Sequence, residues 1–126
     1  MATTKASQPA TGYPVRISTD AYTFVPDLLA EASPPARGIH SQTLSDADGV
    51  ELVLFAMAAG EKLSEHTAAR PAVIHVLEGH GELVVGGDTH PLQAGSWLRM
   101  AKRTAHALTA GTSLVFALYL LPDPQS

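Results

Sequence analysis

The stretch EHTAARPAVIHVLEGHG, residues 65–81, contains three histidines around an apolar run. Its middle, AVIHVLEG at 72–79, is rich in aliphatic and β-branched residues and ends in glycine, a pattern that predicts a buried strand followed by a turn. His66 precedes that strand in a polar segment. It is therefore either a metal ligand or a polar residue beside the core, and any further ligands must come from elsewhere in the chain.

Short strands and turns continue outward from this stretch along most of the chain. Gly and Pro separate the segments, and such short, regular spacing is typical of an all-β sandwich or barrel. We expect a single helical turn, in DLLAEAS at 27–33, because Pro34 and Pro35 stop it. The expected strands cover 37–45, 51–58, 72–79, 81–87, 89–95, 96–101, 105–111 and 113–121.

Length and composition place the chain among single-domain globular proteins. We expect one domain over 15–122, after an N-terminal arm at 1–14 rich in Ala, Thr, Ser, Pro and Gly and before a polar tail at 123–126. The net charge of −4 argues against a nucleic-acid partner, which would select a basic face. No apolar run approaches the roughly 20 residues of a membrane span. The chain has no cysteine, and the expected location is cytoplasmic.

Two of the expected strands are apolar on both faces. ELVLFAMA at 51–58 and SLVFALYLL at 113–121 do not alternate, whereas a lone sandwich needs only its inner face apolar. We therefore expect a homodimer in which outward residues such as Val73 and Leu77 lie at the interface. Cover by the N-terminal arm is the alternative.

Glycines and histidines recur at fixed spacings between residues 60 and 110. Five residues separate Gly60 from His66, and Gly79 follows; five residues also follow Gly95, and His106 comes later. These spacings resemble the two motifs of the cupin family, Gly-x5-His-x-His-x3–4-Glu-x6-Gly and Gly-x5-Pro-x-Gly-x2-His-x3-Asn. The resemblance implies a small RmlC-like cupin, with an all-β jelly-roll β-sandwich barrel also called a double-stranded β-helix.

The chain departs from these motifs at the positions that would hold a metal. In cupins the His-x-His pair, the Glu and the late His bind one divalent ion. Here the second His and the Glu are replaced by Ala68 and Ala72, so only His66 and His106 match. The resemblance thus implies a weak or incomplete site for Ni, Zn, Fe or Mn. The Pro-x-Gly and Asn positions are also changed, to Ala101, Arg103 and Ala110.

A third ligand could come from another histidine. Divalent metals usually need three or more protein ligands to be held tightly. His75 is one candidate, but it alternates with Ile74 and Val76 and points outward if they point inward. His40 is the other, because its strand could run beside the site.

The two alanines leave space beside the two histidines. We expect a roomy and largely apolar interior pocket with imidazoles at one end, which is the usual form of a site for a small organic molecule. Its expected lining is Ala68, Ala72, Ile74, Val76, Leu98, Met100 and Leu108.

Three functions remain open from the sequence. The first is binding of a small organic molecule in the barrel, which the alanines at 68 and 72 favour. The second is a metal-dependent enzyme of the dioxygenase or isomerase type, with His75 or His40 completing the site. The third is a structural dimer module, which leaves the paired histidines without a role. No nucleophile with a base and an orienting group is evident, so no catalytic residue is assigned.

Overall fold

The computed structural model describes residues 15–124, so the expected arm at 1–14 lies outside the described residues. The secondary structure is almost entirely β, as predicted. The elements are β1 (Ile17–Ser18), β2 (Thr23–Phe24), the 3-10 helix η2 (Leu29–Glu31), β3 (Ile39–Ala47), β4 (Val50–Met57), β5 (Lys62–His66), β6 (Ala72–Glu78), β7 (Gly81–Val85), β8 (Asp88–Leu92), β9 (Trp97–Met100), β10 (His106–Ala110) and β11 (Leu114–Leu120).

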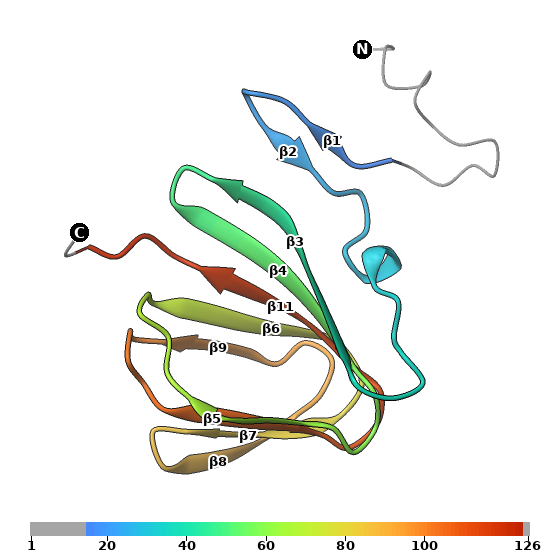
Figure 1. The fold of residues 1–126 in the computed structure, drawn as a ribbon, viewed down its shortest axis with the longest axis vertical. Coiled ribbons are helices and arrows are strands. Elements are labelled where there is room, and N and C mark those ends of the chain that lie inside the picture. The colour runs from blue at the N-terminus through green and yellow to red at the C-terminus, as the bar shows by residue number, and fades with distance from the viewer. Residues whose placement is uncertain (1–14, 125–126) are drawn as a thin grey trace.

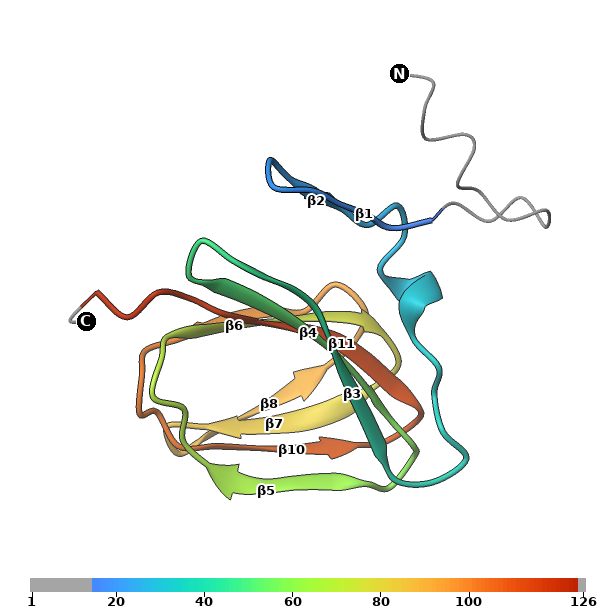
Figure 2. The same cartoon turned by 45° about the horizontal axis from the view of Figure 1, so that its top comes forward.

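Two antiparallel sheets face each other and form the barrel (Figure 1). One has five strands in the order β3-β4-β11-β6-β9, and the other has four in the order β5-β10-β7-β8. A separate hairpin pairs β1 with β2. Figure 2 shows the two barrel sheets as layers, with the hairpin outside them. The jelly-roll prediction is therefore confirmed.

Strand alternation produces the barrel interior. In β6, buried Ala72, Ile74 and Val76 alternate with half-buried residues, because successive strand residues point to opposite faces. Side chains from both sheets fill the space between them in one apolar cluster. Its fully buried members are Met57, Ala72, Ile74, Val76, Leu83, Leu92, Met100, Leu108, Ala110, Leu114 and Phe116.

The outer face of the five-stranded sheet carries a second apolar cluster, which explains the strands that do not alternate. Leu28 and Ala32, on either side of η2, pack against it, as do Leu77 and Tyr119. Residues of the same chain next to η2 therefore cover part of this outer face. The expected arm at 1–14, which was the alternative cover, lies outside the described residues. The cluster consists of Leu44, Leu52, Leu54, Ala56, Val115 and Ala117.

Sequence reasoning missed three strands. β5, KLSEH, has Leu63 as its only apolar residue, and β1 and β2 are only two residues long each. None of them has the apolar pattern from which strands are predicted. The expected helical turn at 27–33 is confirmed as the 3-10 helix at 29–31. None of the helices that the structure describes is long and apolar enough to cross a membrane.

The turn after β6 depends on glycine. Gly79 has a φ of 96°, and a Cβ atom built on it would lie 2.0 Å from the carbonyl oxygen of Ser113. Any other residue would combine an unfavourable backbone conformation with a clash against backbone. Glycine at this position therefore allows the end of β6 to lie directly against the start of β11.

Candidate functional site

The two histidines that match the cupin motifs meet across a pair of strands. His66 is the last residue of β5, His106 is the first of β10, and the two are direct partners in the antiparallel ladder. Their ring centroids are 4.2 Å apart, and the rings are inclined by 56°. The sequence placed both at a metal site, and the structure brings them together at one end of the barrel.

Backbone hydrogen bonds fix the orientation of both rings. The Nδ1 atom of His66 lies 2.7 Å from the carbonyl oxygen of Ser64, and that of His106 lies 2.9 Å from that of Thr104. A carbonyl oxygen only accepts, so each Nδ1 carries the proton and donates. In the neutral ring the lone pair is then on Nε2. Metal-binding histidines are commonly held in this way through the other ring nitrogen.

The pair spans from the interior to the surface. His106 is 8% exposed, and it is the only polar side chain that is buried in the part of the chain from 15 to 124. His66 is exposed at the end of its strand. Because an otherwise apolar core holds a single imidazole, and that imidazole touches a second one open to solvent, the pair is the strongest candidate for a functional site.

The cavity beside the pair is smaller than the sequence predicted. Its volume is about 30 Å³, which is room for only a few water molecules. Phe55 stacks on Phe116 with 4.9 Å between ring centroids and a 3° interplanar angle, and both rings are among the walls of this cavity. The lining is Phe55, Leu63, His66, Ile74, His106, Leu108, Phe116 and Leu118.

Only part of the predicted pocket lining surrounds this cavity. Ile74 and Leu108 do, but the other five predicted residues, Ala68, Ala72, Val76, Leu98 and Met100, are not among its walls. Ala72 is 1% exposed and lies between Met100 and Leu120 in the sheet, so it is packed core. Sequence alternation found the inward residues but could not show which neighbours occupy the space beside them.

Ala68 lies in the loop after β5, and two adjacent basic residues, Lys102 and Arg103, lie in the loop before β10. Both loops border the end of the barrel at which His66 and His106 meet. The backbone N–H of Arg103 donates to the carbonyl oxygen of Ala68 at 2.7 Å and ties the two loops together. Arg103 is exposed and has a φ of 63°. Lys102 forms a part-buried ion pair with Asp123 at 3.0 Å. Of the two adjacent basic residues, Lys102 is thus held in an ion pair, whereas Arg103 is exposed to solvent.

Neither candidate for a third metal ligand is near the pair. His75 lies between inward-facing Ile74 and Val76 and therefore points to the outer face, as alternation predicted. His40 is also on the outer face and is exposed. Within residues 15–124, no group of three His, Cys, Asp or Glu side chains could hold a metal ion. The residues present therefore do not fit a four-ligand or three-ligand metal site.

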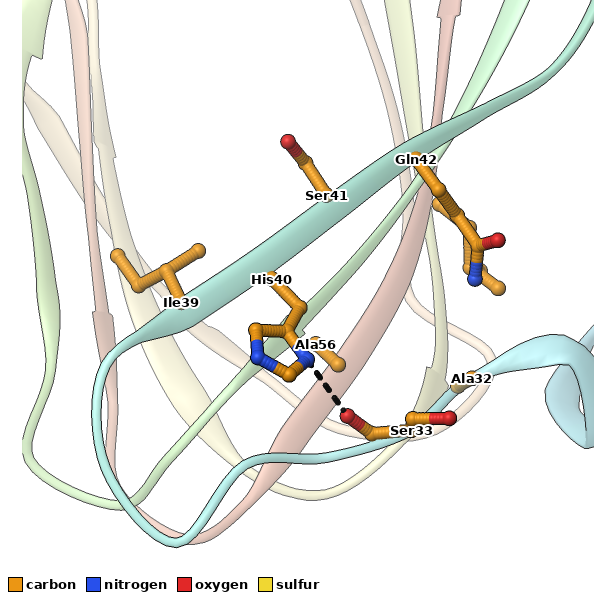
Figure 3. Close-up of a pocket in the computed structure, with 8 residues that line it drawn as sticks. Ala32, Ser33, Ile39, His40, Ser41, Gln42 and Ala56 are labelled. Carbon is orange, nitrogen blue, oxygen red and sulfur yellow. Dashed lines mark hydrogen bonds between the residues drawn. The ribbon is translucent and has the colours of Figure 1, made fainter.

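A larger cavity lies outside the barrel, where the segment after η2 runs beside β3 before turning into it (Figure 3). Its volume is about 530 Å³, and Leu54 and Ala56 are among its apolar walls. His40 donates from Nδ1 to the carbonyl oxygen of Ser33 at 3.0 Å, and Gln42 donates from Nε2 to that of Glu31 at 2.8 Å. These bonds attach the N-terminal segment to the sheet edge and give His40 a structural role.

Comparison with known proteins agrees with the barrel fold. The model of the cupin domain matches residues 53–120, which is more than half of the chain. The chain belongs to the cupin family. This cupin matches no functionally curated protein sequence.

Solved structures of similar fold come from several bacteria. A conserved protein of unknown function from Streptococcus pyogenes has a TM-score of 0.72 at 22% identity, over 90% of this chain and 97% of its own. A cupin superfamily protein from Desulfitobacterium hafniense also has a TM-score of 0.72 at 22% identity, over 79% and 92%. A salicylate 1,2-dioxygenase variant from Pseudoaminobacter salicylatoxidans has 0.63 at 20% identity, over 74% and 29%. At these identities the likeness shows the fold alone.

Proposed function

We propose that this cupin binds a small molecule at the His66–His106 pair and that the same pair takes a divalent metal only weakly. The observation that carries the proposal is the fixed orientation of the two rings. Each Nδ1 is committed to a backbone carbonyl, so two Nε2 atoms are available at the end of the barrel. Two neutral imidazoles are a real but weak ligand set for Ni, Zn, Fe or Mn.

The size of the cavity limits what enters. About 30 Å³ accepts a hydrogen-bonding or anionic end group and little more. The body of the molecule would therefore lie outside, over exposed His66. Arg103, exposed on a bordering loop, would favour an anionic end. A small carboxylic acid fits this description. We expect the protein to act in the cytoplasm, which fractionation of producing cells would test.

The enzyme alternative lacks a supporting observation in the chain itself. A metal centre that performs chemistry keeps three protein ligands and an open position. Residues 15–124 supply only the pair, and both His40 and His75 lie on the outer face. Binding without chemistry is therefore the function that the geometry supports best.

Titration of protein without a histidine tag tests this proposal. Calorimetry with Zn²⁺ and Ni²⁺, and ligand-observed NMR with acetate and benzoate, would be run on wild type and on His66→Ala and His106→Ala. We expect weak binding in wild type and a loss of about tenfold or more in either variant, since each removes half of the Nε2 set. His40→Ala and His75→Ala are matched controls, because they remove outer-face imidazoles, and we expect them to bind as wild type does.

Two results would contradict the proposal. One equivalent of metal retained through dialysis against a chelator would mean that a complete site exists. Equal binding of acetate and benzoate by wild type and by His66→Ala would mean that the carboxylate site lies elsewhere.

A further inference from the structure

A crevice opens between the free edges of the two barrel sheets. β9 ends the five-stranded sheet, and β8 ends the four-stranded sheet (Figure 1). The walls of the crevice are Ile74, Leu83, residues 90–92 and residues 96–98. We call this space the edge crevice. Its volume is about 350 Å³, which lies within the range of about 300–1,000 Å³ typical of small-molecule sites.

The floor of the edge crevice is apolar. Ile74, Leu83 and Leu92 are at most 5% exposed, and all three belong to the barrel core. Leu98, which the sequence predicted for an interior pocket, packs against the same core. Within residues 15–124, Ile74 is the only wall that the edge crevice shares with the small cavity beside the histidine pair. The edge crevice is therefore a second space, separated from that pair by a buried side chain.

His90 places an imidazole over this apolar floor. It pairs with Leu83 in the antiparallel ladder, and residues directly opposite each other point to the same face. Leu83 is fully buried, so His90 also points between the sheets, although it is exposed on its edge strand. His40, His66 and His106 are each bonded through Nδ1 to a carbonyl oxygen. The ring of His90 has no hydrogen bond within residues 15–124, so both of its nitrogens remain available.

The turn that joins β8 to β9 adds a hydroxyl group to the walls. The backbone N–H of Gln93 donates to Oγ of Ser96 at 3.0 Å, and that of Ser96 donates to the carbonyl oxygen of Gln93 at 2.9 Å. The turn is also tied to β6, because the N–H of Gly95 donates to the carbonyl oxygen of Val76 at 2.8 Å. Oγ of Ser96 accepts in this turn, so its hydrogen remains free to be donated. Ser96 thus supplies a donor whose position is fixed in advance.

The walls of the edge crevice carry no permanent charge. Among the walls that residues 15–124 supply there is no Lys, Arg, Asp or Glu, and His90 is the only residue that titrates near neutral pH. The histidine pair differs, because exposed Arg103 lies on a loop that borders it. A carboxylate on the apolar floor would lose its hydration without gaining a cation, which is costly. The edge crevice therefore suits a neutral molecule.

We propose that the edge crevice is a second ligand site of this cupin and that it takes a small neutral aromatic molecule with a hydroxyl group, such as a phenol. The aromatic ring packs on the aliphatic floor next to Trp97, which is among the walls and is 63% exposed. The phenol O–H donates to a ring nitrogen of His90, and the phenol oxygen accepts from the hydroxyl of Ser96. An aliphatic cavity of about 150 Å³ is enough to hold benzene, so the crevice has room for a substituted ring.

Amide chemical shifts of the full chain locate the site. Phenol should shift the resonances of β8, β9 and the turn between them, because these elements form the walls. Benzoate has a ring of the same size but carries a charge, and it should shift the same resonances less. The proposal is overturned if phenol leaves β8 and β9 unchanged, or if benzoate shifts them more than phenol does.

A histidine variant tests the hydrogen bond. His90→Phe keeps a ring over the floor but removes the ring nitrogens. The ratio of phenol affinity to toluene affinity, from NMR titration, should fall about fivefold, as expected for loss of one hydrogen bond at a solvent-accessible rim. His80→Phe is the matched control, because His80 is an exposed histidine outside the crevice, and its ratio should equal that of wild type. An unchanged ratio in His90→Phe, or an equal fall in both variants, would overturn the proposal.

Discussion

The barrel interior and the outer face of the five-stranded sheet are built from the same strands, but they differ in which side chains are buried and which stay exposed. Inside, His106 is the single buried polar side chain among residues 15–124, and it is anchored to backbone. Outside, Leu28 and Ala32 cover the middle of the sheet, while its β9 edge leaves Trp97 bare. A polar side chain buried in an otherwise apolar core is unusual, whereas a single exposed apolar side chain is common on protein surfaces.

The largest effect should come from the interior. Phe116→Ala removes a ring that is 2% exposed and stacked on Phe55, and we expect a loss of about 3–5 kcal/mol in the free energy of unfolding. Chemical denaturation at a fixed protein concentration measures it. A loss below about 1 kcal/mol would mean that the neighbouring side chains collapse into the space.

The covered part of the outer face should behave as a second core. Leu54→Ala, at a residue 2% exposed beneath the segment near η2, should cost about 2–4 kcal/mol. Leu29→Ala is the matched control and should stay within about 0.5 kcal/mol, because Leu29 is exposed. Equal costs for the two variants would show that the outer cluster is not a core.

Filling the position of Ala72 distinguishes a packed wall from an open pocket. Ala72→Phe adds a ring between Met100 and Leu120, and we expect overpacking to cost about 1–3 kcal/mol. Thermal unfolding compared with Ala59→Phe, at an exposed alanine just after β4, provides the contrast. If Ala72→Phe is as stable as wild type, there is free space at this position.

The smallest effect on stability should come from the polar pair itself. His106→Leu replaces the buried imidazole by an apolar side chain, and we expect the free energy of unfolding to change by no more than about 1 kcal/mol. Metal binding should be lost at the same time. If His106→Leu lowers the free energy of unfolding by several kcal/mol, His106 has a structural role in the core and is not a binding residue.

The fold could be predicted because its signals are local. Gly60, Gly79 and Gly95 mark turns, and aliphatic runs such as 72–78 mark buried strands. The pairing of His66 with His106 was implied by the resemblance to the cupin motifs. Each of these signals occupies a few consecutive residues or a fixed interval, so one sequence is enough to find it.

The rest depends on contacts between distant residues. Phe55 and Phe116 are far apart in the chain, and nothing local shows that their rings stack beside the histidine pair. Likewise, Leu28 and Ala32 precede the sheet that they cover, and β5 is too polar to be recognised as a strand. The size of the cavity, the residues that cover the sheet and the pairing of a polar strand all depend on contacts between residues that are distant in the sequence.

The position of β11 has a consequence for biosynthesis. β11 lies between β4 and β6 in the middle of the five-stranded sheet, yet it is the final strand of the described chain to leave the ribosome. Until it does, the facing edges of β4 and β6 lack the partner that joins them, and exposed edges of apolar strands promote aggregation. This domain must therefore complete its sheet after translation of β11, and a nascent chain halted before Leu114 should depend on a chaperone to stay unaggregated.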